Sequence, residues 1–491
     1  MPNGSQYNFR RPSISFIIMI DQTIFRAYDI RGTYPDQLNA EVAESIGKGF
    51  GTYLIRHHNF IQPKVVVGRD ARTHSPELQQ AFIQGLISTG CHVINVGLSP
   101  SPLLYFSNTI GKFDAGCNIT ASHNPGKYNG FKLMTKDAHA VFGDDIQVIR
   151  EIIENQDFEI GEGSLSQANF LGKYIQKIKK MFCIQSSVET QDLASPDVKE
   201  KMKVVIDCGN GIAGAFYPKI LRELGYEVTE LYCELDGTFP NHEPDPIVEG
   251  NLKDLKQKVL ELKANIGLAF DGDGDRVGIV TETGKFINAD KLLMLLTKDV
   301  LTRHPKSKIV FTVSNSQVLF DLTKQWGGNP IMCKVGHSYV ENAMHEHHAI
   351  LGGEQSGHFF LPEDYYGYDD ALITACRILA IANQNGKPVS ELFSDFPPIY
   401  SEPEMRPYCA DDLKFEVLEK IMNYFKDRYP SNTLDGIRMD FGNGSWAGIR
   451  VSNTSPCLSV IMEGGSRKAL DEVKVIVLEH LKTYPEIVRK R

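Results

Sequence analysis

Short apolar runs bounded by glycines alternate along the chain with longer stretches that have helical spacing. In the first third, residues 63–70 (PKVVVGRD) form an apolar run with the length of a buried strand. Residues 75–90 follow with helical spacing and place Pro76 in the first turn, and residues 91–97 form the next apolar run. This alternation is typical of strand–helix–strand units with a parallel sheet.

The same order of strand, helix and strand recurs twice further along the chain. Similar unit shapes at separate places predict repeated α/β domains, although sequence identity between the units is slight. The recurring elements are expected at residues 202–208, 217–225 and 226–233, and then at 307–313, 316–328 and 329–336.

The last part of the chain departs from this alternation. A proline-rich stretch at 395–407 has the composition of a linker. After it, the pattern predicts strands in succession next to helices, without the crossover helices that parallel strands need. Such an arrangement is typical of a small α+β domain. The elements are expected at residues 411–428, 436–442, 446–453, 457–464 and 467–483.

We therefore expect four domains. The first residues contain two arginines and a short apolar stretch, but they lack the small-residue cleavage site of a signal peptide, so we expect a poorly packed extension. The predicted divisions are 1–20 for the extension, 21–168, 169–286 and 287–397 for the α/β domains, and 398–491 for the α+β domain.

Composition and charge restrict the classes of function. The 491 residues carry 52 basic and 61 acidic side chains, a net charge of −9, whereas nucleic-acid binding requires clustered positive charge. No apolar run reaches the roughly 18 residues of a membrane span. The nine cysteines are scattered and odd in number, as expected of reduced thiols. We expect a cytoplasmic protein that binds neither nucleic acid nor membranes.

A serine beside a histidine stands in the loop NITASHNPGKYNGFK, residues 118–132. A hydrolase nucleophile needs a G-x-S-x-G elbow between a strand and a helix, and this chain has A-S-H-N-P instead. Adjacent side chains such as Ser122 and His123 rarely point toward each other well enough for proton abstraction. A hydroxyl among donors from His123 and Asn124 and the cation of Lys132 is suited to carrying a phosphoryl group. Taken alone, the stretch also fits an ordinary glycine-rich surface loop.

Three aspartates separated by glycines follow a predicted buried strand in NIGLAFDGDGDRVGIV, residues 265–280. The spacing of Asp271, Asp273 and Asp275 projects three carboxylates to one side, and glycines let the backbone fold around an ion. Converging carboxylates repel one another unless a hard cation is bound, so we expect Mg²⁺. An EF-hand calcium loop with Glu282 at its twelfth position is the alternative, but the next residues predict a strand where an EF-hand continues into a helix.

Two further polar loops follow apolar runs. In ILGGEQSGHFF, residues 350–360, Glu354 and Ser356 place an acceptor and a donor on one side, which suits vicinal sugar hydroxyls; a polar turn is the alternative. In GIRVSNTSP, residues 448–456, one loop carries a guanidinium, hydroxyls and an amide, a set that binds phosphate. A β-turn explains the second loop as well. The phosphate set consists of Arg450, Ser452, Asn453 and Thr454.

Two other patterns compete with these sites. Gly209, Gly211 and Gly214 form G-x-G-x-x-G after a predicted strand, with Glu230 downstream, which is the pattern of a dinucleotide site. The Asn-Gly step and the position in mid-chain disfavour that interpretation. The HEHH sequence at 345–348 lies in a polar helical stretch, where we expect a solvated helix end rather than a metal site.

In this order, TASHNP, DGDGDR, GGEQSGH and RVSNTSP resemble the motifs of the α-D-phosphohexomutase superfamily. The sequence FRAYDIRG at 25–32 is similar to that of the phosphomannomutase/phosphoglucomutase branch. The resemblance covers almost the whole chain. It implies three related α/β/α domains followed by a small C-terminal α+β domain of the TATA-binding-protein-like type, arranged around a central cleft.

The resemblance also implies an activity. Members interconvert hexose 6- and 1-phosphates, here mannose phosphates and also glucose phosphates, through a phosphoserine that matches Ser122. A bound hexose 1,6-bisphosphate is the intermediate and also serves as activator. The implied metal is Mg²⁺, held by Ser122 together with Asp271, Asp273 and Asp275.

The remaining site residues are carried over by similarity. Lys132 and His358 are the expected acid and base, and Arg31 and Arg276 are expected at the reacting phosphoryl group. By similarity, the substrate contacts are Tyr28, His123, Asn124, Lys334, His337, Glu354, Ser356, Arg450, Ser452, Asn453 and Thr454.

This chain departs from the branch at two positions. Ser314 stands where relatives tend to carry a lysine, and Gln355 stands where they often carry a methionine. GEQSGH is familiar from phosphoglucosamine mutases, which makes that activity the alternative; an NAD-binding oxidoreductase at the 209–214 glycines is a distant one. The expected partners are hexose phosphates, and we expect a monomer or a weak dimer.

Overall fold

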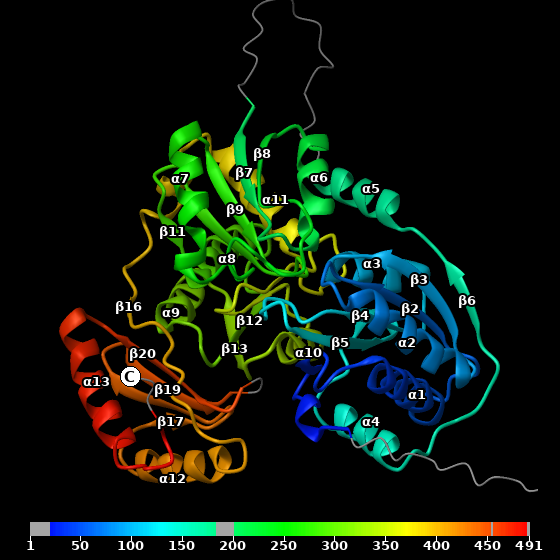
Figure 1. The fold of residues 1–491 in the computed structure, drawn as a ribbon. Coiled ribbons are helices and arrows are strands. Elements are labelled where there is room, and N and C mark those ends of the chain that lie inside the picture. Colours follow the sequence, from blue (N-terminus) through cyan, green and yellow to red (C-terminus); the bar gives the residue numbers. More distant parts are fainter. Residues whose placement is uncertain (1–19, 183–200, 453–454, 489–491) are drawn as a thin grey trace, which may run out of the picture.

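The computed structural model describes residues 20–182, 201–452 and 455–488, so the expected extension at 1–20 lies outside the described residues except for Ile20. The strands of the described residues form four sheets, which follow one another along the chain (Figure 1). We call each sheet with its helices a unit. Three mixed sheets with helices precede a small C-terminal sheet, which confirms the α/β class. The residue boundaries of the domains and the TATA-binding-protein-like type of the last one stay predictions.

The sheet of the first unit has the strand order β1-β5-β4-β2-β3-β6. β2, β3, β4 and β6 are parallel, whereas β5 returns antiparallel to β4 and β1 is antiparallel to β5. Pro76 lies in the first turn of α2, where a missing N–H costs no helical hydrogen bond. The elements are β1 (Ile30–Thr33), α1 (Ala40–His57), β2 (Lys64–Arg69), α2 (Ser75–Ser88), β3 (His92–Leu98), α3 (Ser101–Gly111), β4 (Ala115–Ile119), β5 (Tyr128–Thr135), α4 (Asp144–Glu154) and β6 (Ser164–Gln167).

The second unit has the strand order β11-β10-β9-β7-β8. β7, β8 and β9 are parallel, and β10 returns antiparallel to β9. The elements are α5 (Leu171–Phe182), β7 (Lys203–Asp207), α6 (Tyr217–Glu223), β8 (Glu227–Leu231), α7 (Lys253–Leu262), β9 (Ile266–Phe270), β10 (Val277–Thr281) and β11 (Phe286–Ile287).

The third unit has the strand order β13-β12-β14-β15, with β12, β13 and β14 parallel and β15 antiparallel to β14. The elements are α8 (Ala289–Arg303), β12 (Lys308–Thr312), α9 (Gln317–Gln325), β13 (Asn329–Cys333), α10 (His337–His347), β14 (Leu351–Gly353), β15 (Phe359–Phe360) and α11 (Ala371–Asn385).

These three units share one plan. In each, the third parallel strand ends in a loop that turns back into an antiparallel strand: β4 into β5, β9 into β10 and β14 into β15. Three of the sequence motifs occupy these loops. We call the loops the serine loop (residues 120–127), the aspartate loop (271–276) and the glutamate loop (354–358).

The fourth unit is antiparallel throughout, in the strand order β16-β20-β19-β18-β17. α12 and α13 pack against this sheet. The fourth motif begins on β19, which carries Arg450, and continues into the loop before β20. The elements are β16 (Tyr400–Ser401), α12 (Lys414–Lys426), β17 (Ser431–Asn432), β18 (Ile437–Gly442), β19 (Ser445–Val451), β20 (Leu458–Gly464) and α13 (Arg467–Leu481).

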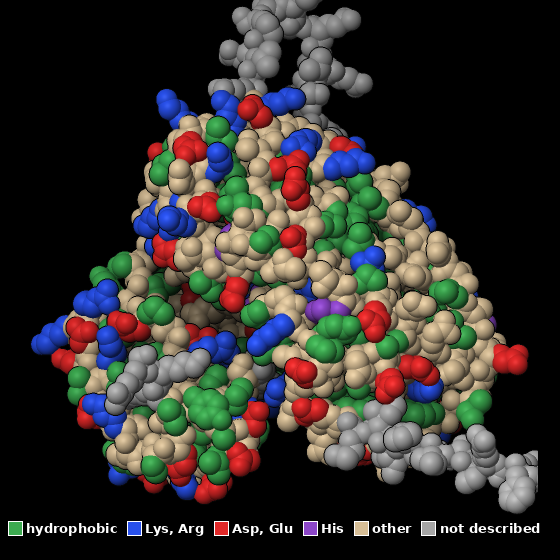
Figure 2. Space-filling model, in the orientation of Figure 1, with side chains coloured by type: hydrophobic (Ala, Val, Ile, Leu, Met, Phe, Trp, Pro, Cys, Tyr) green, Lys and Arg blue, Asp and Glu red, His purple; other side chains and the backbone are tan. Residues whose placement is uncertain are grey.

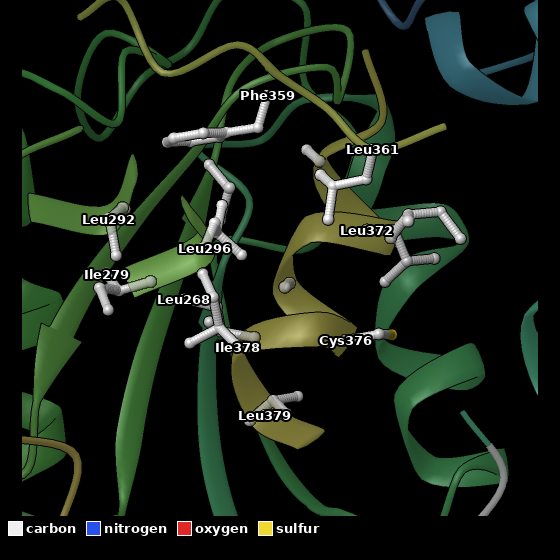
Figure 3. Packing of buried hydrophobic residues seen from close by; sticks show 14 of the residues in the cluster. Leu268, Ile279, Leu292, Leu296, Phe359, Leu361, Leu372, Cys376, Ile378 and Leu379 are labelled. Atoms are coloured by element: carbon white, nitrogen blue, oxygen red, sulfur yellow. The ribbon is translucent and has the colours of Figure 1, made fainter. Parts of the chain in front are cut away.

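A continuous apolar core joins the second and third units. Side chains of β9 and β10 pack with side chains of α8, α11 and the segment after β15 (Figure 3). Full burial of one large apolar side chain contributes about 1.5–3 kcal/mol, so this core fixes the strands that precede the aspartate loop relative to the third unit. The labelled members are Leu268, Ile279, Leu292, Leu296, Phe359, Leu361, Leu372, Cys376, Ile378 and Leu379.

Arg438 on β18 fixes the fourth unit against the third. Its guanidinium donates to the carbonyl of Asn315 at 3.0 Å and to Oε1 of Gln317 at 3.2 Å, and it lies 3.4 Å from the ring centroid of Trp446. Glu463 accepts from the backbone N–H of Gln317 at 3.1 Å. Figure 2 shows the surface hollowed where this fourth unit faces the rest of the molecule.

Candidate active site

The serine loop places Ser122 in a buried position with an unusual backbone. Ser122 is 1% exposed and has a φ of 49°, in the left-handed region that few residues other than glycine adopt. Its Oγ donates to Oδ2 of Asp271 at 2.7 Å. The hydroxyl of the first unit therefore meets a carboxylate of the second unit directly.

The contact between Ser122 and His123 differs from our prediction. Oγ of Ser122 lies 3.2 Å from Nδ1 of His123, because the left-handed residue breaks the alternation of side chains that a strand would impose. Burial, with the nearby cations of Arg276 and Arg31, lowers the pKa of His123 well below its usual value. The loop leads into an antiparallel strand rather than a helix, so it is not a nucleophile elbow.

The aspartate loop brings three fully buried carboxylates together. Asp271, Asp273 and Asp275 each offer one oxygen, and these atoms lie within 4.8 Å of one another. Burial and the two neighbouring carboxylates raise the pKa of Asp271 well above its usual value. The loop continues into strand β10, and Glu282 instead accepts from the backbone N–H of Ser390 at 3.0 Å, so the EF-hand alternative fails.

These carboxylates fit a metal ion. Oδ1 of Asp273 and Oδ1 of Asp275 are buried and have no hydrogen-bond partner among the described residues. A buried carboxylate oxygen without a partner is costly, and hard cations such as Mg²⁺ take oxygen ligands.

Lys132 on β5 supplies a cation at the same place. Its ammonium group donates to Oδ2 of Asp273 at 2.7 Å and also to Asp275. Burial alone would lower the pKa of Lys132, but the two carboxylates raise it well above its usual value. Lys132 therefore keeps its proton and contributes a positive charge in this arrangement.

His358 in the glutamate loop has a defined tautomer. Its Nδ1 lies 2.5 Å from Oδ2 of Asp369, and its Nε2 lies 2.9 Å from Nε of Arg276, which can only donate. Nε2 thus accepts, and Nδ1 carries the proton toward Asp369. Burial, with the cation of Arg276, lowers the pKa of His358 to about 4. The imidazole is neutral at physiological pH and has an acceptor nitrogen directed at Arg276.

Glu354 and Ser356 of the glutamate loop have spare hydrogen-bonding capacity. Oε2 of Glu354 accepts from the backbone N–H of Gly336 at 2.9 Å, and burial raises the pKa of the Glu354 carboxyl. Oγ of Ser356 is buried and has no hydrogen-bond partner in the described part of the chain. Both side chains can accept or donate to a ligand hydroxyl.

Further predicted residues surround these loops. Arg31 on β1 donates to Oδ1 of Asn124 at 2.8 Å, which places its guanidinium beside the serine loop. The ring of Tyr28 contacts that of His337 at 5.1 Å between centroids, and His337 stacks on His358 at 5.5 Å. Direct contacts therefore link most of the predicted catalytic set. The linked residues are Tyr28, Arg31, Ser122, His123, Asn124, Lys132, Asp271, Asp273, Asp275, Arg276, His337 and His358.

Lys334 and the fourth motif lie apart from that set. Lys334 is exposed, with its ammonium 5.7 Å from the ring centroid of Tyr339. Arg450 lies 3.7 Å from Glu404 and its Nε is buried without a hydrogen-bond partner among the described residues. Ser452 accepts from Arg406 at 3.2 Å. The predicted residues Asn453 and Thr454 lie outside the described residues.

Ser314 and Gln355, the two residues that depart from the branch, make different contacts. Ser314 follows β12 and lines a small cavity together with Arg450 of the fourth unit. Gln355 donates to Oδ2 of Asp290 at 3.0 Å, so it anchors the glutamate loop to α8.

The glycines at 209–214 pack closely instead of opening a dinucleotide site. A Cβ on Gly211 would lie 2.8 Å from Cα of Gly272 in the aspartate loop, and one on Gly214 would lie 2.1 Å from the carbonyl of Cys233. Glu230 pairs with Arg222 on α6. The HEHH residues form the polar end of α10, as predicted.

Comparison with known proteins gives three family matches along the chain. Residues 22–160, 173–284 and 288–400 match the α/β/α domains I, II and III of phosphoglucomutase/phosphomannomutase. A phosphomannomutase/phosphoglucomutase of Pseudomonas aeruginosa is 42% identical over 461 residues, covering 94% of this chain and 96% of that protein. The chain belongs to the phosphoglucomutase/phosphomannomutase family.

Other members of the family agree. A phosphoglucomutase of Neisseria meningitidis is 36% identical, with 93% of this chain and 96% of that protein covered. The crystal structure of a phosphoglucomutase/phosphomannomutase family protein from Burkholderia thailandensis superposes with a TM-score of 0.85 at 36% identity, covering 95% and 98% of the two chains. Family members are isomerases that use a metal ion, and the aspartate loop is an acidic site that can bind one.

Two residues at the site were not predicted from the sequence. Asp369 lies eleven residues after His358 and holds its Nδ1 proton, and the guanidinium of Arg406 contacts Ser452. Neither residue belongs to a motif, and only the folded chain brings them to the site. None of the helices in the described part of the chain combines the length and apolar character that a membrane crossing requires.

Proposed function

We propose that this protein is a Mg²⁺-dependent phosphohexomutase that interconverts mannose 6-phosphate and mannose 1-phosphate, and also acts on glucose phosphates. Family membership supports hexose phosphates as the substrate class. The observation that carries the proposal for this chain is the 2.7 Å contact between Oγ of Ser122 and Asp271 in the aspartate loop. A serine hydroxyl beside an acidic metal site is arranged for carrying a phosphoryl group.

Ser122 acts as the phosphoryl carrier in this proposal. The P–Oγ bond of phosphoserine breaks as a hydroxyl of the hexose monophosphate attacks, giving a bound hexose 1,6-bisphosphate and free serine. The other phosphate of the bisphosphate then returns to Oγ, leaving the isomeric monophosphate. A divalent cation held by Asp271, Asp273 and Asp275 neutralises charge on the phosphoryl oxygens.

Two side chains have the protonation states that this exchange needs. Nε2 of His358 is unprotonated and accepts from Arg276, and it can take the proton of the attacking sugar hydroxyl when that hydroxyl replaces Arg276 as its donor. The Lys132 ammonium keeps its proton and can donate to the departing serine oxygen. Arg31, which bonds Asn124 of the serine loop, and Arg276, which pairs with Asp271, neutralise charge on the transferring group.

The remaining predicted residues hold the substrate. Glu354 and Ser356 offer an acceptor and a free hydroxyl to the vicinal sugar 3- and 4-hydroxyls. Arg450 and Ser452, with Asn453 and Thr454, bind the phosphate that does not react. Tyr28, His123, Asn124, Lys334 and His337 contribute further contacts.

The accompanying details belong to the proposal as well. Hexose 1,6-bisphosphate acts as activator because it phosphorylates Ser122. The eight cysteines in the described residues are free and buried, which suits a cytoplasmic location. We propose a monomer or weak dimer without nucleic-acid or membrane partners.

The test is an interconversion assay primed with a trace of glucose 1,6-bisphosphate. Wild-type protein should convert mannose 1-phosphate and glucose 1-phosphate to the 6-phosphates, and Ser122→Ala should lower both rates by at least about 10³-fold. Ser107→Ala is the matched control, since this buried serine only bonds the carbonyl of Leu103 within α3. Near-normal turnover by Ser122→Ala would refute the proposal.

Gln355 supports one alternative, a phosphoglucosamine mutase, because the sequence GEQSGH is familiar from those enzymes. Glucosamine 6-phosphate in the same assay separates the two. A kcat/KM higher for glucosamine 6-phosphate than for mannose 6-phosphate would favour the alternative.

A further inference from the structure

Arg72, in the turn between β2 and α2, is fully buried and lies directly beneath the serine loop. Neither its position in the sequence nor the motifs marked it as a site residue. A buried guanidinium is costly unless its N–H groups are hydrogen-bonded. The hydrogen-bond acceptors of Arg72 therefore indicate the role of this buried side chain.

All five N–H groups of the Arg72 guanidinium have acceptors. Nε donates to Oδ2 of Asp70 at 3.1 Å. Nη1 donates to the carbonyls of Pro125 at 2.9 Å and Tyr128 at 3.0 Å. Nη2 donates to the carbonyls of Ser122 at 2.8 Å and Asn124 at 2.6 Å. Four of the five bonds hold backbone carbonyls of the serine loop or of the residue that follows it.

Asp70 connects Arg72 to a second support. Its Oδ2 also accepts from Oγ1 of Thr120 at 2.8 Å, and Oγ1 of Thr120 accepts from the backbone N–H of Ser122 at 3.0 Å. Ser122 is thus held at its N–H through Thr120 and at its carbonyl through Arg72. A non-glycine residue in the left-handed region persists only where its surroundings fix it, and these two bonds do so.

Arg72 also touches the second unit, which carries the aspartate loop. Its guanidinium lies 4.9 Å from the ring centroid of Phe239. A Cβ on Gly237 would lie 2.4 Å from Cα of Arg72, so the two backbones are in close contact. The support beneath the serine loop is therefore packed against the unit that supplies Asp271.

We propose that Arg72, together with Asp70 and Thr120, forms a brace that positions Ser122 Oγ against the aspartate loop for phosphoryl transfer. Arg72 contacts neither the hydroxyl nor the substrate groups, so it is a positioning residue. The inference rests on the proposed role of Ser122 as phosphoryl carrier. A planar guanidinium is required because the ammonium of lysine has only three donors, so at least two of the five acceptors would lose the bond that Arg72 gives them.

The brace predicts a specific kinetic change. Arg72→Lys should lower kcat by about 10²-fold, the effect of a displacement of about 1 Å at a reacting group. KM for mannose 1-phosphate should change by less than about 3-fold, because other loops hold the sugar and its phosphate. Arg69→Lys is the matched control: Arg69 is half-buried at the end of β2, three residues before Arg72. Among the described residues its side chain donates to the carbonyl of Asp70 alone, so the substitution should leave both constants unchanged.

A second pair of variants covers the case in which Arg72→Lys does not fold. Thr120→Val removes the hydroxyl that joins Asp70 to the Ser122 N–H, whereas Thr120→Ser keeps it. Thr120→Val should lower kcat by about 10-fold or more at unchanged KM, and Thr120→Ser should restore it. A purely structural role would instead lower the melting temperature of Thr120→Val without separating kcat from KM.

The readout is single-turnover phosphorylation by glucose 1,6-bisphosphate, followed by intact mass. Wild type that never gains the phosphoryl group would overturn the proposed function itself. Wild type that gains it, with Arg72→Lys or Thr120→Val phosphorylated at the wild-type rate, would overturn the brace alone. Slow phosphorylation of these variants at wild-type KM supports it.

Discussion

The serine loop and the aspartate loop occupy the same position in two units but present different side-chain groups. Each leaves the third parallel strand of its sheet and returns as an antiparallel strand. The serine loop presents one hydroxyl above the buried guanidinium of Arg72, whereas the aspartate loop presents three carboxylates. The repeated plan determines where a loop projects, and the side chains determine which group it can hold.

The two loops also depend on each other. Ser122 Oγ reaches Asp271, and Gly272 has no side chain where the Ser122 carbonyl packs; a Cβ there would lie 2.4 Å from that oxygen. The candidate site thus exists only between units. Substitutions in the two loops should therefore both impair phosphoryl transfer, but to different extents.

Removal of the metal ion should have the largest effect, because the aspartate loop then lacks its counter-charge. Chelation should lower turnover by about 10³-fold or more, which corresponds to several kcal/mol of charge stabilisation, and added Mg²⁺ should restore it. Asp273→Asn should be similarly impaired, whereas the exposed control Asp412→Asn should not. Full turnover after exhaustive chelation is the contrary result.

The glutamate loop extends the comparison, since it occupies the same position in the third unit and carries His358, the proposed base. His358→Ala should lower kcat by about 10²-fold or more, with the exposed His345→Ala as control. Because burial lowers the pKa of His358 to about 4, the neutral base persists as the pH falls. If kcat depends on the unprotonated form of His358, it should stay level down to about pH 5 and fall as the pH approaches 4. An acidic limb centred near pH 6.5 that disappears in His358→Ala would argue against this pKa.

The close approach of the two loops can be broken by one methyl group. Gly272→Ala should reduce the free energy of unfolding by about 1–3 kcal/mol, because its Cβ clashes with the Ser122 carbonyl. Gly172→Ala in α5 is the control, since a Cβ there meets no atom within 4 Å. Denaturant titration measures both variants. A Gly272→Ala midpoint equal to that of the wild type would mean that the loops are not in tight contact.

The smallest effect is expected at the sugar contact. Glu354→Gln should lower kcat/KM by roughly 10-fold, the loss of a hydrogen bond to a charged group, mainly through KM. Glu346→Gln on the exposed end of α10 should leave the constants unchanged. Steady-state kinetics that show a loss only in kcat would assign Glu354 a different role.

Much of this architecture was predictable from local patterns. Apolar runs predicted β2, β7 and β12 within one residue, because buried parallel strands have continuous apolar sequences. The loop motifs were also recognisable, because glycines and carboxylates cluster within a few residues. Ser122, Asp271 and His358 could therefore be named before the fold was known.

The rest depended on long-range placement. Arg72 lies 50 residues before Ser122, and Asp369 resembles any aspartate before a helix, so neither has a local signature. The contact between Ser122 and His123 was missed because the left-handed backbone of Ser122 is imposed by Thr120 and Arg72. Supporting residues become visible only when the folded chain shows their acceptors.

The mass of the serine-loop peptide tests the central claim most directly. After incubation with glucose 1,6-bisphosphate, a proteolytic peptide that contains Ser122 should gain about 80 Da, the mass of one phosphoryl group. Excess hexose monophosphate should then discharge it at a rate no slower than turnover, and Ser122→Ala should show no gain. Active protein whose Ser122 peptide never carries the added mass would contradict the account.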